Sequence, residues 1–178
     1  VSSLKVVEAG ASQLVCEVIS SSDGNVTVSA LDGGKTVSTA TTAVTAGTAT
    51  RVTVADLASN HSYTLSAVAQ STSGELSAAR TASGKTTTPF AFAVADKTDT
   101  TLTVNIQTNC KGTLDITYTE RKTGKKETRV TGLLLEKDTK RDFVISDLTP
   151  STEYDVTATF TDLLDGSYTV SDRVTTAA

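Results

Sequence analysis

Apolar and polar residues alternate along most of the chain. The alternation is clear in residues 14–18, 26–30, 102–106 and 114–118. Because successive side chains of a β-strand point to opposite faces, this pattern predicts strands with one buried and one solvated face. No segment shows the sustained i, i+3, i+4, i+7 apolar spacing of an amphipathic helix. We therefore expect an all-β protein made of antiparallel sheets.

Short turn motifs separate the predicted strands. About one residue in five is Thr, a β-branched residue that favours strands. Gly and Asp favour the backbone conformations of tight turns, and they recur between the strand-like segments in Ser22-Asp23-Gly24, Asp32-Gly33-Gly34, Lys122-Thr123-Gly124 and Asp165-Gly166. Many short strands at regular spacing predict a β-sandwich or a β-barrel.

The chain repeats itself once. Residues 52–57 are followed by Tyr63, and residues 143–148 are followed by Tyr154, 91 positions further along. A period this long indicates duplication of a whole domain rather than a short solenoid repeat. Pro89 marks the junction, so we predict one domain at residues 1–88 and a second at 89–178. Since the junction is short and proline restricts the residue before it, we expect an elongated and fairly stiff pair.

The repeated segment resembles the tyrosine corner of fibronectin type III domains. The pattern is Asp-Leu, then five residues, then Tyr-x-Val/Leu-x-Ala, with Leu57 and Tyr63 in the first copy and Leu148 and Tyr154 in the second. In the tyrosine corner, the Tyr hydroxyl reaches back to the backbone a few residues upstream. The resemblance covers essentially the whole chain and implies two tandem antiparallel β-sandwiches of fibronectin type III or another immunoglobulin-like type.

One position departs from that family. Fibronectin type III domains usually have a Trp on the second strand, where this chain has Val18 and Ile106. We expect Phe92, Phe143 and Phe160 to fill the second core. The first domain has no Phe at all. Because large aromatic side chains bury much apolar area, we expect the first domain to be the less stable one.

The residue inventory disfavours catalysis, cofactors and metals. His61 is the only histidine, so a multi-histidine metal site or a histidine triad within this chain is excluded, and we expect His61 to be an ordinary residue of an exposed turn. We interpret Cys16 as a buried free thiol and Cys110 as a loop thiol. The formal net charge of −4 and pI near 5.0 argue against a nucleic-acid partner. No apolar run approaches the length of a membrane helix, so membrane insertion is not expected.

Candidate surface sites lie in loops and turns. Asn25 and Asn60 begin N-glycosylation sequons, which matter only in a secreted protein. Asp162 and Asp165 offer oxygen atoms, but their spacing does not match an EF-hand loop. The tentative binding loops of the second domain, which we expect at one end of its sandwich, contain Asn109, Lys111, Asp162, Asp165 and Tyr168.

Three hypotheses for the function follow. The leading one is a non-enzymatic structural or adhesive module, a spacer or protein-binding segment of a larger extracellular or surface protein, whose partners are other proteins or neighbouring domains. The second is a subunit of a surface filament, fibre or virion decoration. A long unpaired strand at a terminus would favour it, and residues 1–7 fit either such a strand or an ordinary first strand. The third is an accessory linker of a polysaccharide-degrading enzyme. The chain begins at Val1 and has no Met, so we expect a processed chain or an excised fragment.

Overall fold

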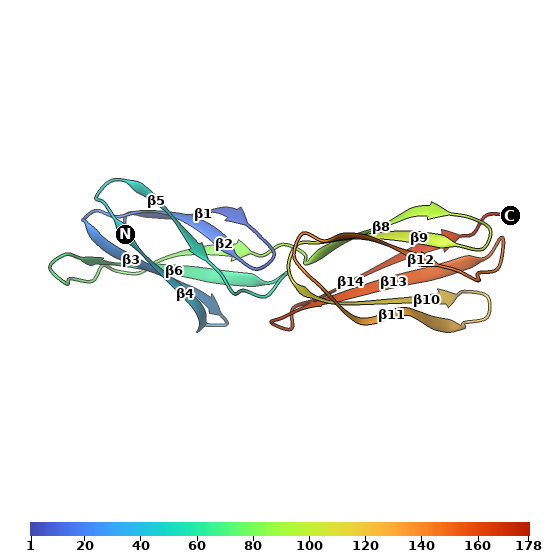
Figure 1. Ribbon diagram of the computed structural model, residues 1–178. Coiled ribbons are helices and arrows are strands. Elements are labelled where there is room, and N and C mark those ends of the chain that lie inside the picture. The colour runs from blue at the N-terminus through green and yellow to red at the C-terminus, as the bar shows by residue number, and fades with distance from the viewer. The chain divides into compact units, whose positions relative to one another are not determined.

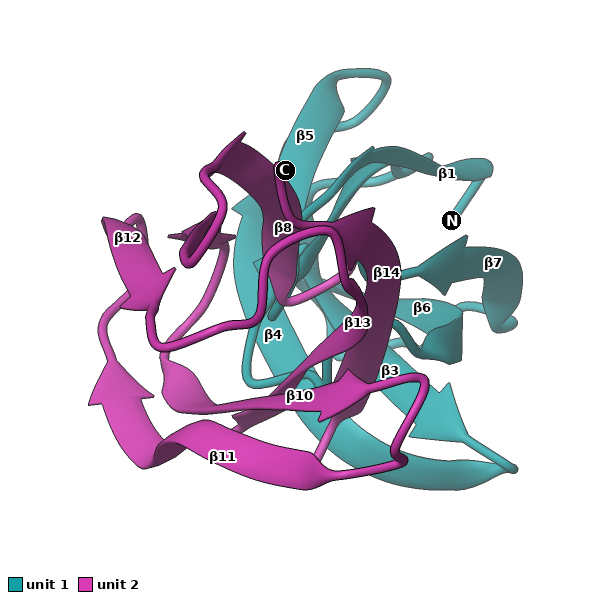
Figure 2. Ribbon diagram, turned by 90° about the vertical axis from the view of Figure 1, so that its right-hand side faces the viewer, with its two compact units in different colours: residues 1–87 teal, residues 88–178 magenta.

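The structure is a computed structural model that describes residues 1–178. It contains fourteen β-strands and no helix, so no helix has the length and hydropathy needed to cross a membrane. The strands divide into two compact units, Val1–Thr87 and Thr88–Ala178 (Figures 1 and 2). Each unit has its own pair of antiparallel sheets, as the alternating sequence pattern predicts.

The first unit is a sandwich of a three-stranded sheet and a four-stranded sheet. The smaller sheet has the order β1-β2-β5, with bounds β1 (Ser3–Ala9), β2 (Leu14–Ile19) and β5 (Ala49–Val54). The larger has the order β4-β3-β6-β7, with bounds β3 (Gly24–Asp32), β4 (Lys35–Val44), β6 (Ser62–Ser71) and β7 (Arg80–Lys85). Residues 1–7 are thus not an unpaired segment, because β1 pairs with β2 from Ser3 onward.

The second unit repeats this topology. Its smaller sheet has the order β12-β9-β8, with bounds β8 (Phe90–Lys97), β9 (Leu102–Thr108) and β12 (Lys140–Ile145). Its larger sheet has the order β11-β10-β13-β14, with bounds β10 (Gly112–Glu120), β11 (Lys126–Leu135), β13 (Glu153–Asp162) and β14 (Ser167–Thr175). Strand for strand, this is the connectivity of the first unit.

Each core lies between the two sheets of its own unit. Val18 and Ile106, which replace the usual Trp, are fully buried. Small and medium side chains fill the first core, where Leu14, Leu57 and Leu65 are among the largest fully buried residues. In the second core, Phe143 and Phe160 are buried, as expected.

Phe90, rather than Phe92, is the third aromatic residue of the second core. Phe90 is 1% exposed, and its ring lies 5.7 Å from that of Phe160, whereas Phe92 is only partly buried. Both residues belong to β8, which is an edge strand. Burial of its inward-facing positions falls from Phe90 toward the end of the strand, so the expectation for Phe92 was wrong.

A tyrosine fastens the same turn in both units. The Tyr63 hydroxyl accepts a hydrogen bond of 2.9 Å from the backbone N–H of Ala58. The Tyr154 hydroxyl accepts one of the same length from the N–H of Thr149. Leu57 and Leu148 are buried in the adjoining core. The residue before each leucine, Asp56 or Asp147, has a positive φ, a conformation that Asp tolerates better than most residues.

A buried threonine holds the other side of each turn. The Thr86 hydroxyl donates to the carbonyl of Ala58 at 2.6 Å, and the Thr176 hydroxyl donates to that of Thr149 at 2.6 Å. Both side chains are almost completely buried. In each unit, the Tyr and the Thr therefore bind the N–H and the carbonyl of one turn residue. The sequence pattern did not single out these threonines among so many others.

We predict that removal of the Tyr154 hydroxyl destabilises the second unit. Tyr154→Phe removes the partly buried hydrogen bond to the N–H of Thr149, and the loss of a typical hydrogen bond costs about 0.5–1.5 kcal/mol. Equilibrium urea unfolding measures the change in the free energy of unfolding. Tyr168→Phe is the matched control, because no hydrogen bond includes the Tyr168 hydroxyl, and it should leave stability within about 0.5 kcal/mol of wild type. Equal effects of the two variants would contradict the prediction.

Candidate binding surface

Two loops meet at one end of the second unit. Residues 109–111 join β9 to β10, and residues 163–166 join β13 to β14. Gly112 at the start of β10 pairs with Asp162 at the end of β13, which brings the loops side by side. The five tentative binding residues lie in or beside these loops, and most of their polar groups already have partners within the unit.

Asn109 fastens the beginning of the second unit. Its side-chain Nδ2 donates to the carbonyl of Thr88 at 3.0 Å, and its backbone N–H donates to the carbonyl of Pro89 at 2.7 Å. A side chain held in this way has little capacity left for a partner. Lys111 is also engaged, because its Nζ lies 2.8 Å from Glu136 Oε1 in an ion pair.

Asp162 organises the turn between β13 and β14. Its Oδ1 accepts hydrogen bonds from the backbone N–H groups of Leu164 at 2.8 Å and Gly166 at 2.9 Å. Asp165 has a φ of 61° in the same turn. The Asp162 carboxylate thus serves the turn, and the chain contains no group of three or more His, Cys, Asp or Glu residues that could hold a metal ion.

Two leucines form the most exposed apolar part of this end. Leu163 is 66% exposed and Leu164 is 50% exposed. Tyr168 is half-buried, and its ring packs edge-on against Phe90 at 5.9 Å, so it does not form a free aromatic platform. The sequence pattern indicated a polar turn, and the leucines were missed because a short apolar pair inside a turn carries no periodicity.

Both cysteines are free and buried. Burial raises the pKa of the Cys16 thiol to about 11. Burial, followed by the nearby charge of Asp162, raises the pKa of Cys110 to about 11 as well. Thiolates are the reactive form of cysteine, and the raised pKa values favour the protonated thiol of both residues at neutral pH. The interpretation of Cys110 as a loop thiol missed its burial, since its side chain is 5% exposed.

The remaining polar candidates lie on the first unit. Asn25 is exposed on β3. Asn60 is partly buried in the turn before β6, where its N–H donates to the carbonyl of Thr87 at 2.8 Å. His61 Nε2 lies 3.1 Å from Asp32 Oδ2, so this histidine lies beside a carboxylate rather than free in solvent.

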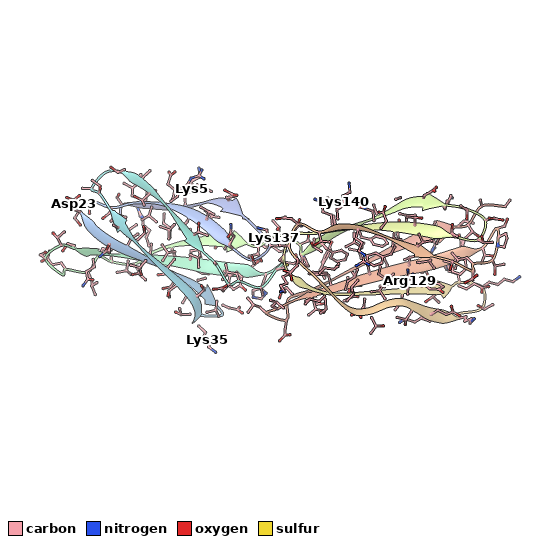
Figure 3. All side chains as sticks on the ribbon, in the orientation of Figure 1. Lys5, Asp23, Lys35, Arg129, Lys137 and Lys140 are labelled. Atoms are coloured by element: carbon pink, nitrogen blue, oxygen red, sulfur yellow. The ribbon has the colours of Figure 1, made fainter.

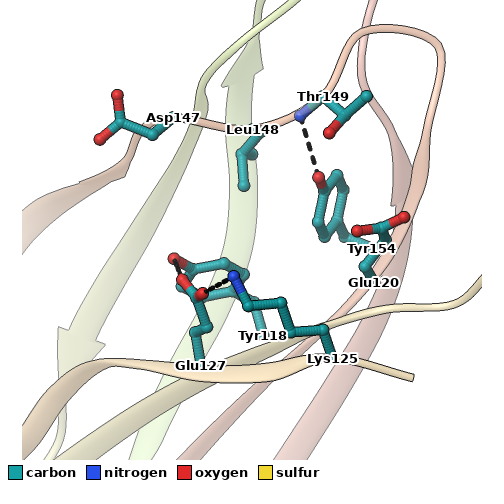
Figure 4. Close-up of a pocket in the computed structure, with 8 residues that line it drawn as sticks. All are labelled: Tyr118, Glu120, Lys125, Glu127, Asp147, Leu148, Thr149 and Tyr154. Atoms are coloured by element: carbon teal, nitrogen blue, oxygen red, sulfur yellow. Dashed lines mark hydrogen bonds and ion pairs between the residues drawn. The ribbon is translucent and has the colours of Figure 1, made fainter. Parts of the chain in front are cut away.

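A small hollow in the second unit is lined by charged and phenolic groups (Figure 4). Its volume is about 100 Å³. The Tyr118 hydroxyl donates to Glu127 Oε2 at 2.7 Å, and Lys125 forms an ion pair with the other oxygen of that carboxylate (Figure 4). The Tyr154 hydroxyl of the tyrosine corner lies on the opposite side of the hollow, against the N–H of Thr149.

The contacts in this hollow favour the protonation states that Tyr118, Lys125 and Glu127 ordinarily have at neutral pH. Burial, and then the hydrogen bond to Glu127, raises the pKa of Tyr118 to about 12. The hydrogen bond from Lys125 lowers the pKa of Glu127, and the same contact raises the pKa of Lys125. Each shift moves the pKa of the group further from pH 7. General acid–base catalysis favours a pKa near the working pH, and these shifts move all three pKa values away from it.

Comparison with solved structures identifies the fold. A segment of two fibronectin type III domains from chicken tenascin is similar to this chain, with a TM-score of 0.50 and 18% sequence identity over 98% of both chains. The FN1–FN3 domains of chicken CNTN1 give a TM-score of 0.36 and 12% identity, over 99% of this chain and 67% of that one. No protein-family model and no curated protein matches the sequence. The chain has the fold of two tandem fibronectin type III domains.

We predict a tyrosine titration near pH 12 that belongs to Tyr118. An unfolded Tyr loses its proton near about pH 10, whereas folded Tyr118 keeps its proton until about 12. The stability that this group contributes is therefore present below about pH 10 and is lost as the pH rises through about 12. Ultraviolet absorbance of phenolate, followed at alkaline pH, measures the transition.

Two variants assign that transition. Tyr118→Phe should remove it, and Glu127→Gln should move it to lower pH, because one of the causes of the raised pKa is gone. Since burial is the larger cause, the shift with Glu127→Gln should be partial. A highest-pH transition that is identical in wild type and Tyr118→Phe would refute the assignment.

Proposed function

We propose that this chain is a non-catalytic structural and protein-binding segment of a larger extracellular or surface protein. In this role, its two fibronectin type III-type domains act as a short, stiff spacer that presents surfaces to protein partners or to neighbouring domains. Tandem domains of this fold occur in the tenascin segment that the chain resembles. Catalysis by this chain is not part of the proposal.

The observation that carries the spacer role is that backbone groups on both sides of the junction are hydrogen-bonded within their own units. The N–H of Thr87 donates to the carbonyl of Gly10 at 3.0 Å, within the first unit. The carbonyl of Thr88 accepts from Asn109, and that of Pro89 accepts from the same residue, within the second unit. Each unit therefore holds its own end of the junction, and Pro89 fixes its own φ. A flexible linker needs several unrestrained residues.

The state of the ionisable groups supports a non-catalytic role. The two thiols have raised pKa values, and the hollow around Tyr118 contains a closed network of partners. A catalytic centre needs a nucleophile, a base and a stabiliser of developing charge that converge on one reacting atom. We identify no such set among the residues of either unit.

Direct binding of polysaccharide has weaker support. Stacking on a sugar ring requires an exposed aromatic face. The best candidate from sequence, Tyr168, packs against Phe90. An accessory role in a polysaccharide-degrading enzyme would then be passive, as a linker, and no observation favours it over a general spacer.

A distance measurement between spin labels tests the spacer role. We would attach nitroxides to Thr72→Cys in the β6–β7 turn and Lys122→Cys in the β10–β11 turn, since both residues are exposed. The native thiols are buried. Wild type treated with the same spin-label reagent serves as the check that they do not react. Pulsed electron paramagnetic resonance should give one narrow distance distribution.

A matched variant shows whether the junction is the cause. Pro89→Gly removes the ring that fixes φ and should broaden the distribution while leaving the unfolding of each unit unchanged. A broad distribution in the unmodified junction, as for two domains on a flexible tether, would contradict the spacer role.

A further inference from the structure

β4 is a long sheet edge with one side open. It is the outermost strand of its sheet and pairs only with β3, from Lys35 opposite Asp32 to Val44 opposite Gly24. A single bulge near Val37 interrupts the pairing, and the register is regular from Ser38 to Val44. Along this regular part, every second N–H and carbonyl points away from β3. No backbone hydrogen bond to another element uses these outward groups.

The side chains of β4 do not protect this edge. From Thr36 to Val44, the strand contains no charged residue, no Pro and no Gly. Val37 is 46% exposed, and Thr39, Thr41 and Ala43 are exposed on the same face of the sheet. Natural sheets usually protect long edges with charges, proline, bulges or a covering segment, because an open edge is a template for another strand.

The other edges of the chain are protected. Arg80 in β7 donates to the carbonyl of Ser2 at 2.8 Å, which ties that edge to the N-terminal segment. Each remaining edge strand contains charged residues, among them Lys5 in β1, Arg51 in β5, Asp96 in β8, Arg129 in β11, Lys140 in β12 and Asp172 in β14. Figure 3 labels Lys5, Arg129 and Lys140 on three of these strands. No other edge strand has an uncharged run as long as Thr36–Val44 of β4. Near the start of this run, the Ser38 hydroxyl donates to the carbonyl of Ala55 at 2.7 Å, so the open stretch is residues 39–44.

We propose that β4 pairs antiparallel with β4 of a second copy of this chain. Around the twofold axis of such a pair, residues on either side of the axis face their counterparts, and the residue on the axis faces itself. Like charges opposite each other destabilise a sheet, so self-pairing requires an uncharged stretch, which Thr36–Val44 of β4 provides and β11 does not. The two four-stranded sheets then join into one continuous sheet.

Charges at the two ends of β4 favour a second copy over an unrelated strand. Lys35 begins the strand, and Asp23 lies beyond its other end, where its Oδ1 accepts from the N–H of Ala46 at 2.8 Å (Figure 3). Neither residue forms an ion pair within the chain. Antiparallel pairing brings Lys35 of each copy toward Asp23 of the other, so the twofold axis creates two complementary contacts. Self-pairing goes beyond the proposed function, because a spacer does not require it.

Sedimentation equilibrium of the full chain over a wide concentration range tests the proposal. Wild type should form a reversible dimer. Thr41→Lys places like charges at the centre of the paired edge and should weaken dimerisation by at least about tenfold, the ratio that about 1.4 kcal/mol produces. Thr128→Lys is the matched control, because Thr128 is also exposed on an edge strand and faces a Thr of the neighbouring strand, as Thr41 does. The control should dimerise as wild type does.

A cross-linking experiment remains informative if a lysine variant folds poorly. Cysteines placed one at a time at Thr39, Thr41 and Ala43 should give a disulfide-linked dimer under mild oxidation, most strongly for the residue nearest the axis. Thr128→Cys should not. A monomeric wild type at all concentrations, dimerisation unaffected by Thr41→Lys, or failure of all three cysteines to cross-link would overturn the proposal. In the last two cases, a dimer would have to use another surface.

Discussion

Burial of every second side chain between two facing sheets is the constraint on which each unit depends. Seven short strands bury enough apolar area only if their inward faces are in register with one another. The two units meet this requirement with different side chains. The first uses Val, Leu and Ala around Leu57, and the second adds Phe90 and Phe160.

The side-chain hydrogen bonds that hold the turn before the Tyr are the same in both units. Tyr63 and Tyr154 bind the N–H group of a turn residue, and Thr86 and Thr176 bind the carbonyl of that same residue. These partly buried hydrogen bonds give the backbone of each turn partners within its own unit, next to the buried Leu57 or Leu148. The two units therefore share individual hydrogen bonds as well as the fold. Duplication of a whole domain would produce this agreement.

Sequence reasoning succeeded where the signal was local and periodic. The alternation predicted the strands, and the resemblance to tyrosine corners indicated the sandwich type. It failed where a residue's role depends on a partner far along the chain. Asn109 binds the carbonyl of Thr88, 21 positions away, and Thr176 binds Thr149. No local sequence pattern predicts contacts between residues so far apart in the chain. The burial of Cys110 and the partial exposure of Phe92 likewise follow from which strands lie at sheet edges and loop ends.

Most polar groups of the candidate loops are used internally, whereas the outward backbone groups of β4 have no partner in another strand. Amide hydrogen exchange at low and high protein concentration tests this most directly. Self-pairing predicts that the outward amides between Ser38 and Val44 become slower to exchange as the concentration rises, while those of β11 do not change. Unchanged exchange in β4, or slowing confined to the loops at residues 109–111 and 163–166, would contradict it.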